Sequence, residues 1–302
     1  AIDLVEQLIA GALPDEAILA NLKADMIKRR ADSKLNQQSN FSAMQRYVFY
    51  GPEFIRRTTL DNPSLEALTS PELLSKVREL MGKQHEVLYY GPMSEKEFTA
   101  TLAEHHKTAA ELQPLEKIYS TPQPTDRAKV VLAQYDAKQL YYLQYSNRGE
   151  LFDVKTDPEI NLYNEYFSGG MNSICFQEMR EARGLAYSAY AMLSKPGNLK
   201  APYMFYAFIA TQNDKMRQAI EAFDSIINDM PESEAAFAIA KEAMLSRIRT
   251  ERTVKQGVLW SYLSLRELGL TEDRSKQLFE KVQSMTLEDV KAAQRKWVKD
   301  RH

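Results

Sequence analysis

The side chains best placed to do chemistry in this 302-residue chain are an arginine and a tyrosine seven residues apart, Arg180 and Tyr187. Arg180 falls on an expected helical segment, and Tyr187 begins an expected apolar strand, with Gly184 in the turn between them. Guanidinium and phenol groups both donate hydrogen bonds, and together they could stabilise a carbonyl oxygen that gains negative charge during hydrolysis. Composition and spacing alone favour a surface arginine and a half-buried strand tyrosine with no chemical role.

Metal chemistry within the chain has little support from the histidines. A helix-borne zinc pair needs two histidines about one turn apart, whereas adjacent His105 and His106 point about 100° apart on a helix. We therefore predict surface histidines and no metal or other cofactor bound by this chain. The four histidines are His85, His105, His106 and His302.

Nucleophilic and phosphate-binding motifs are also missing. The chain contains no Gly-x-Ser-x-Gly nucleophile motif. Its single cysteine, Cys175, stands between apolar residues and is expected to be a buried structural thiol. Gly169-Gly170 lacks the Lys-Ser/Thr of a phosphate loop and is expected to form a tight turn between two helices.

Composition excludes several kinds of partner. The net charge of -2 and the isoelectric point of about 6.2 give no reason to expect a nucleic-acid or anionic-membrane partner. No apolar run is long enough for a membrane span, and no signal peptide is visible. One cysteine cannot form an internal disulfide, so a soluble chain in either the cytoplasm or the periplasm remains open.

Residues 1–107 are expected to be helix-rich, with one strand. Apolar residues at four-residue spacing predict helices over the first fifty residues, ended by Gly51-Pro52. Further helices are expected from Ser70-Pro71 to Gly82 and, from the capping box Ser94-Glu-Lys-Glu97, to about His106. The segment from Val87 to Tyr90 is typical of a short buried strand, whose sheet partners must come from elsewhere. Residues 108–128, rich in proline, serine and threonine, are expected to form an extended linker.

Residues 129–302 have the order of an α+β domain, with strands first and helices later. Val130 to Tyr135 and Leu140 to Tyr145 are expected to pair as a hairpin. Two short helices from Pro158 to about Arg183 are followed by a second strand pair, Leu185 to Met192 and Met204 to Thr211. Apolar stripes then predict helices to the end of the chain.

The stretch from Tyr166 to Ser188, YFSGGMNSICFQEMREARGLAYS, resembles the signature of the second, metal-free half of the pitrilysin/insulinase family of zinc peptidases, which includes the mitochondrial processing peptidases. The resemblance implies an antiparallel or mixed sheet packed by helices. It further implies that residues 129–302 form one complete C-terminal repeat and residues 1–107 the helical closing half of the preceding, third repeat. In that family an arginine and a tyrosine seven residues apart hold substrate backbone near the scissile bond. Arg180 and Tyr187 match this pair, with Gly169, Gly170 and Gly184 supporting the turns.

The resemblance implies a function that this chain would not perform alone. The family's His-x-x-Glu-His zinc motif does not occur here. We therefore expect the C-terminal, substrate-binding part of a zinc metalloendopeptidase that degrades or processes peptides. The zinc would lie in an absent N-terminal half of the same protein or in a catalytic partner subunit. The alternative is a catalytically silent scaffold or partner subunit with the same fold.

Overall fold

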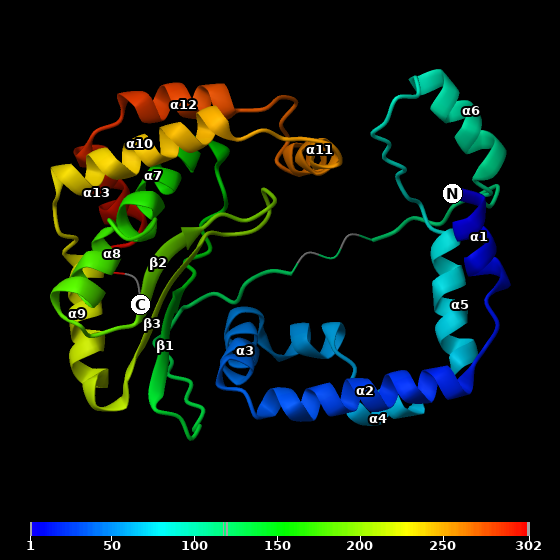
Figure 1. Ribbon diagram of the computed structural model, residues 1–302, viewed down its shortest axis with the longest axis horizontal. Coiled ribbons are helices and arrows are strands. Elements are labelled where there is room, and N and C mark those ends of the chain that lie inside the picture. Colours follow the sequence, from blue (N-terminus) through cyan, green and yellow to red (C-terminus); the bar gives the residue numbers. More distant parts are fainter. Residues whose placement is uncertain (1, 117, 119, 301–302) are drawn as a thin grey trace. The chain divides into compact units, whose positions relative to one another are not determined.

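The computed structural model describes residues 2–116, 118 and 120–300, which form two compact units (Figure 1). The first unit comprises Ala1–Tyr47, Pro52–Ser120 and Lys255–Leu259. The second comprises Val48–Gly51, Thr121–Val254 and Trp260–His302. No helix among the described residues is both long and apolar enough to cross a membrane. The assignment of these segments to particular repeats of the family stays a prediction.

The first unit is built from helices whose beginnings are fixed by local side-chain caps. The Asp15 and Asn36 side chains accept the first free N–H groups of α2 and α3, and a Thr69–Glu72 capping box begins α5. The Ser94–Glu97 capping box begins α6 as expected. The helices are α1 (Ile2–Gly11), α2 (Glu16–Lys34), α3 (Gln37–Thr58), α4 (Asn62–Ala67), α5 (Ser70–Met81) and α6 (Glu95–His105).

Gly51 ends the first helical segment as expected, with a φ of 77°, and a second helical segment runs beyond Pro52 to Thr58. Two other expectations for the first unit are wrong in detail. Thr69, rather than Ser70, caps α5 because its hydroxyl faces the Glu72 N–H. Val87 to Tyr90 is not a buried strand, because a strand needs a neighbouring ladder and the described residues give this segment none.

The second unit contains a three-stranded antiparallel sheet with strand order β1-β3-β2. Its strands are β1 (Gln139–Ser146), β2 (Ser188–Ser194) and β3 (Met204–Gln212). The predicted pairing of the last two is confirmed, in a register that places Ala191 opposite Ala207. Together with the helices that follow, this sheet confirms the α+β class, with antiparallel strands throughout the described sheet.

The predicted hairpin of Val130–Tyr135 with Leu140–Tyr145 is wrong. The second segment forms β1, but β1 pairs with β3, as Leu143 opposite Phe208 shows. The first segment forms no strand, and the side chains of Val130 and Leu132 are 82% and 88% exposed. An alternating apolar pattern gives a segment strand character, but the partner strand is chosen by contacts far along the chain.

Two layers of helices cover one face of this sheet (Figure 1). Helix α7 packs on β2, and α10, α12 and α13 pack against α7. The Asn164 and Ser168 side chains of α7 bond the main chain of Leu193 and Ala191, and so protect the outer edge of β2. The helical elements are η1 (Val154–Thr156), α7 (Asp157–Ser168), α8 (Ile174–Phe176), η2 (Gln177–Ala182), η3 (Asn213–Lys215), α9 (Met216–Asn228), α10 (Glu234–Thr250), α11 (Gly257–Glu267), α12 (Ser275–Ser284) and α13 (Leu287–Trp297).

The main hydrophobic core lies between the sheet and these helices. Its buried members all fall between Phe152 and Val298, so this core belongs to the second unit. Cys175 is fully buried in it, which confirms the expected structural thiol. Burial raises the pKa of this thiol to about 12, and a hydrogen bond with Ser168 opposes the shift only in part.

The Cys175 thiol should therefore react with alkylating reagents only when the second unit opens. At about pH 8, a pKa near 12 leaves roughly one thiol in ten thousand as the reactive thiolate, and the buried sulfur is shielded as well. Iodoacetamide labelling followed by mass spectrometry should be at least about a hundredfold slower in native buffer than in guanidinium chloride. Equal rates in the two conditions would contradict the buried position.

Candidate functional site

The turn between η2 and β2 is the element that presents Arg180 and Tyr187. Residues Gln177–Ala182 widen from an α-helix into a π-helical turn, a feature that is frequent at functional sites. The carbonyl of Met179 accepts the N–H groups of both Leu185 and Ala186, at 2.9 and 3.2 Å. Tyr187 then donates its N–H to Ala210 at 3.1 Å and so extends the sheet ladder by one residue. Strand β2 itself begins at Ser188, three residues later than the sequence predicts.

Gly184 allows the chain to reverse inside this turn. Its φ is +57°, in the left-handed region that residues with a Cβ avoid. Its N–H donates to Arg180 at 3.1 Å, and its carbonyl accepts a hydrogen bond from Lys215 Nζ at 3.2 Å. Gly169 and Gly170 form the tight turn expected between α7 and α8, in which the Gly170 carbonyl accepts from the Ser173 N–H. The three predicted turn glycines therefore lie at turns on either side of the π-helical segment.

The structure brings Arg180 and Tyr187 together. The Arg180 guanidinium carbon lies 5.2 Å from the centre of the Tyr187 ring and 5.0 Å from that of Phe176. Both distances fit cation–π contacts, which fix where the guanidinium lies. The Tyr187 side chain is 72% exposed rather than half-buried, and the Arg180 side chain is 46% exposed. Arg180 Nε lies 3.8 Å from Glu181 Oε1, which is too far for a hydrogen bond.

This geometry gives two exposed hydrogen-bond donors at one surface position. The guanidinium is charged at any physiological pH and carries five N–H donors, and the phenol adds an O–H. Of the nearby carboxylates, Glu181 lies within ion-pair distance of Arg180, whereas Glu178 pairs with Arg183 Nη2 at 3.0 Å. An anionic or partially negative oxygen between the two side chains could accept from both.

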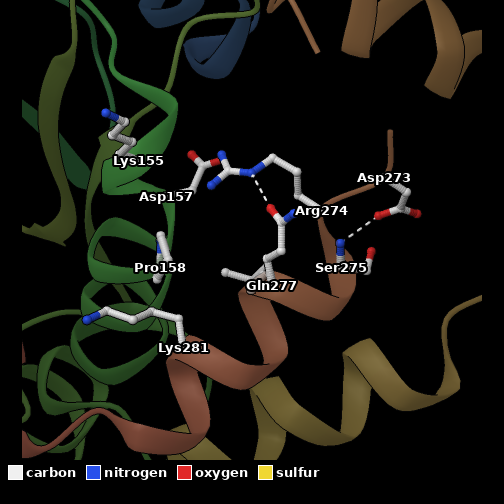
Figure 2. Close-up of a pocket in the computed structure, with 9 residues that line it drawn as sticks. Lys155, Asp157, Pro158, Asp273, Arg274, Ser275, Gln277 and Lys281 are labelled. Atoms are coloured by element: carbon white, nitrogen blue, oxygen red, sulfur yellow. Dashed lines mark hydrogen bonds between the residues drawn. The ribbon is translucent and has the colours of Figure 1, made fainter. Parts of the chain in front are cut away.

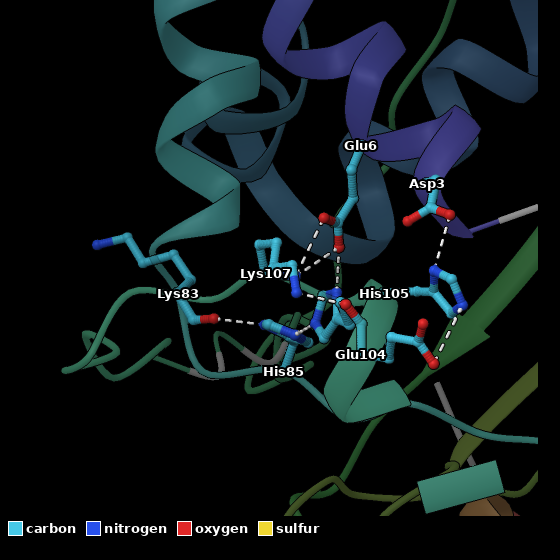
Figure 3. A network of polar contacts seen from close by, with 8 residues as sticks. Asp3, Glu6, Lys83, His85, Glu104, His105 and Lys107 are labelled. Carbon is cyan, nitrogen blue, oxygen red and sulfur yellow. Dashed lines mark hydrogen bonds and ion pairs between the residues drawn. The ribbon is translucent and has the colours of Figure 1, made fainter. Parts of the chain in front are cut away.

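The histidines are arranged differently from the prediction. His85 and His106 lie with their Nε2 atoms 2.7 Å apart, and His105 pairs with Asp3 at 2.8 Å (Figure 3). Sequence reasoning missed the pair, because His85 and His106 are 21 residues apart and no local pattern links them. No cluster of three or more His, Cys, Asp or Glu side chains within the described ranges could hold a metal ion. His302 lies outside the described residues.

A cavity of about 450 Å³ lies elsewhere in the second unit, where α7 and α12 begin (Figure 2). Its wall mixes cations and carboxylates, and several of them already have partners. Arg274 Nη1 donates to the Val154 carbonyl at 2.9 Å, and Asp273 accepts from the Ser275 N–H at 2.6 Å. The mixed charge gives no preference for a cationic or an anionic ligand.

Comparison with known protein families shows the class to which the chain belongs. Residues 76–244 match the family described as the peptidase M16 inactive domain, and the chain belongs to that family. This confirms the resemblance to the non-catalytic C-terminal portion of pitrilysin-type peptidases. Among curated proteins, none matches the chain by sequence.

Solved structures share the fold at low sequence identity. The peptidase M16 inactive domain from Pseudomonas fluorescens is 18% identical with a TM-score of 0.68, over 93% of this chain and 67% of its own. The periplasmic protease PqqL from Escherichia coli is 14% identical with a TM-score of 0.63, over 93% of this chain and 31% of its own. The ferredoxin protease FusC, solved with Arabidopsis ferredoxin, is 14% identical with a TM-score of 0.65, over 95% of this chain and 32% of its own. This chain thus spans about a third of the two proteases.

The position of the Arg–Tyr turn depends on a buried hydrogen bond that can be removed. Thr211 Oγ1 donates to the Leu185 carbonyl at 2.6 Å, two residues before Tyr187. Thr211→Val keeps the volume but leaves this buried carbonyl unpaired, so it should lower the free energy of unfolding by about 1–3 kcal/mol. Chemical denaturation measures the change.

Thr250→Val is the matched control for this prediction. The Thr250 hydroxyl bonds the Ser246 carbonyl at the exposed end of α10, where water can replace it. Its substitution should change stability by no more than about 0.5 kcal/mol. If the two variants are equally stable, the Thr211–Leu185 bond does not hold the turn.

Proposed function

We propose that this chain is the substrate-binding, non-catalytic part of a zinc metalloendopeptidase. The observation that carries the proposal is the exposed Arg180–Tyr187 contact, with the guanidinium carbon 5.2 Å from the ring centre. In a peptide hydrolysis reaction the scissile carbonyl oxygen gains negative charge, and donors aimed at that oxygen stabilise the transition state. The Arg180 N–H groups and the Tyr187 hydroxyl are such donors.

The turn supports a binding role because it orients the Arg180 and Tyr187 donors before any substrate binds. Two N–H groups bound to the Met179 carbonyl and one bound to Ala210 fix the main chain on both sides of the pair. Stacking on Phe176 and Tyr187 restricts the Arg180 side chain further. Donors that are already oriented need little reorganisation when substrate arrives, and this is the condition under which they accelerate a reaction.

The ligand in this proposal is a peptide or protein, and the zinc belongs to another part of the assembly. The ferredoxin protease similar to this chain was solved with a protein bound, which supports a polypeptide ligand. The described residues offer no three-ligand metal cluster, so we assign the zinc and its activated water to an N-terminal half or a catalytic partner subunit.

Exposed apolar side chains in the first unit support a missing partner surface. Leu4 and Leu8 on α1, Leu22 on α2 and Leu80 on α5 are all exposed. Soluble proteins rarely leave many large apolar side chains in water unless another surface covers them. The sheet of a neighbouring repeat is the partner that these helices fit, since helices of an α+β layer bury their apolar sides on a sheet.

Arg180→Ala and Tyr187→Phe should each lower the turnover of the assembled peptidase. The chain is to be combined with a zinc-bearing M16 half or subunit from the same genome, and cleavage of a fluorogenic peptide is followed. Loss of one well-placed donor to the developing oxyanion should lower kcat by on the order of a hundredfold. The change in KM should be smaller if the bond strengthens in the transition state.

Arg183→Ala and Tyr190→Phe are the matched controls. Arg183 belongs to the same turn and pairs with Glu178 at the surface, and Tyr190 projects from β2 and stacks on Phe208. Both controls should keep kcat within about twofold. An assembled peptidase indifferent to Arg180→Ala and Tyr187→Phe would contradict the clamp and favour a silent scaffold.

A further inference from the structure

The pair formed by His85 and His106 joins three segments of the first unit. His106 caps the end of α6, His85 lies in the loop after α5, and Glu6 on α1 bonds the other ring nitrogen of His106 (Figure 3). The Lys107 main-chain N–H donates to both Glu6 oxygens at 3.1 Å. With the contact from His106, these bonds place both carboxyl oxygens of Glu6 against nitrogen atoms.

The Nδ1 atom of each imidazole ring faces an oxygen acceptor. His85 Nδ1 lies 2.7 Å from the Lys83 carbonyl oxygen, which can only accept, so this nitrogen carries a proton. His106 Nδ1 faces Glu6 Oε1, a carboxyl oxygen that serves as the acceptor for this ring. Both Nε2 atoms therefore point toward the same position, with their Nδ1–H groups oriented by oxygens.

That arrangement is the one in which protein imidazoles bind transition metals. A metal-ligating histidine almost always donates its other ring N–H to a carboxylate or a main-chain carbonyl, which fixes the ring and its tautomer. Here one ring has each kind of acceptor. Two nitrogens at about 2.05 Å from a tetrahedral metal lie about 3.3 Å apart, so the 2.7 Å contact must open by less than about 1 Å.

The surroundings leave room for that opening and for further ligands. An apolar groove of about 480 Å³, lined in part by Ile2, Val5 and Met81, borders His85, His106 and Glu6. Water entering from this groove could complete the coordination. The neighbouring charged side chains contact other groups. Asp3 and Glu104 face His105, and Lys107 Nζ donates to the Glu104 carbonyl.

We propose that His85 and His106 form a two-histidine site for a divalent transition metal such as Zn²⁺, with Glu6 and the Lys83 carbonyl as outer partners. When the metal binds, any proton shared by the two Nε2 atoms leaves to solvent, and both nitrogens donate their lone pairs to the metal. This site is independent of the zinc of the proposed peptidase, because its ligands lie in this chain and neither belongs to the Arg–Tyr turn.

Calorimetric titration of the full 302-residue chain with Zn²⁺ tests the site. We expect one saturable site with a dissociation constant in the micromolar range. His85→Gln and His106→Gln should each weaken binding by more than about tenfold, and Glu6→Gln by about tenfold through loss of the outer carboxylate. Circular dichroism checks that each variant is folded, and His85→Gln, in an exposed loop, keeps the test decisive if His106→Gln unfolds.

His105→Gln is the matched control, since it removes a neighbouring imidazole whose Nδ1 is held by Asp3. Its affinity for Zn²⁺ should stay within about twofold of the unaltered chain. Absence of saturable binding, or an affinity that His85→Gln leaves unchanged, would overturn the site. Neither result depends on peptidase activity, so the proposed function is tested separately.

Discussion

The main-chain carbonyl of Met179 is the fixed point on which the candidate site depends. Met179 is fully buried in the core, and its carbonyl accepts hydrogen bonds from the N–H groups of Leu185 and Ala186. One end of this closed loop directly precedes Arg180, and the other directly precedes Tyr187. Because both ends meet at one buried atom, the two side chains that follow them emerge close together from a rigid base. The cation–π contact then completes an arrangement that the main chain has already imposed.

The π-helical turn explains why a spacing of seven residues works here. In a continuous α-helix, residues seven apart lie on the same face two turns apart, about 10 Å along the axis. The chain instead widens at Gln177–Ala182 and reverses at Gly184, which brings Tyr187 back to Arg180. The reversal needs a left-handed residue, and the widening forgoes regular α-helical hydrogen bonds. Local departures of this kind are maintained where a particular side-chain position matters more than regular structure.

Features that depend on neighbouring residues could be predicted from the sequence, whereas the pairing of strands distant in the sequence could not. The capping box at Ser94–Glu97 and the buried Cys175 could be read from neighbouring residues, because caps and apolar environments are encoded within a few positions. The strand predictions that failed are those in which a partner strand had to be named. Val87 to Tyr90 has strand character without a ladder among the described residues. Val130 to Tyr135 forms no strand, and β1, its predicted partner, pairs with β3 instead.

The two candidate sites also differ in whether the sequence could reveal them. Arg180 and Tyr187 are close in sequence, and the family resemblance singled them out, although the exposure of Tyr187 was underestimated. His85 and His106 meet where Glu6 on α1 and the end of α6 come together. The two histidines are 21 positions apart, and no sequence pattern between them predicts the contact. Comparing single histidines for helical spacing could not find such a pair. A search for histidines next to helix ends, where a cation is favoured, would have selected His106 but not its partner.

The two units differ in how completely they bury their apolar side chains, and this difference bears on the proposed substrate-binding role. The second unit buries its sheet and helices around one core, and fully burying a large apolar side chain contributes about 1.5–3 kcal/mol, so the Arg–Tyr turn rests on a stable base. In the first unit, Leu19, Phe41 and Leu65 are buried, while many apolar side chains of α1, α2 and α5 face water. Covering them would favour association by the same hydrophobic effect. Arg180 and Tyr187 thus belong to the second unit, and the exposed apolar side chains of α1, α2 and α5 belong to the first.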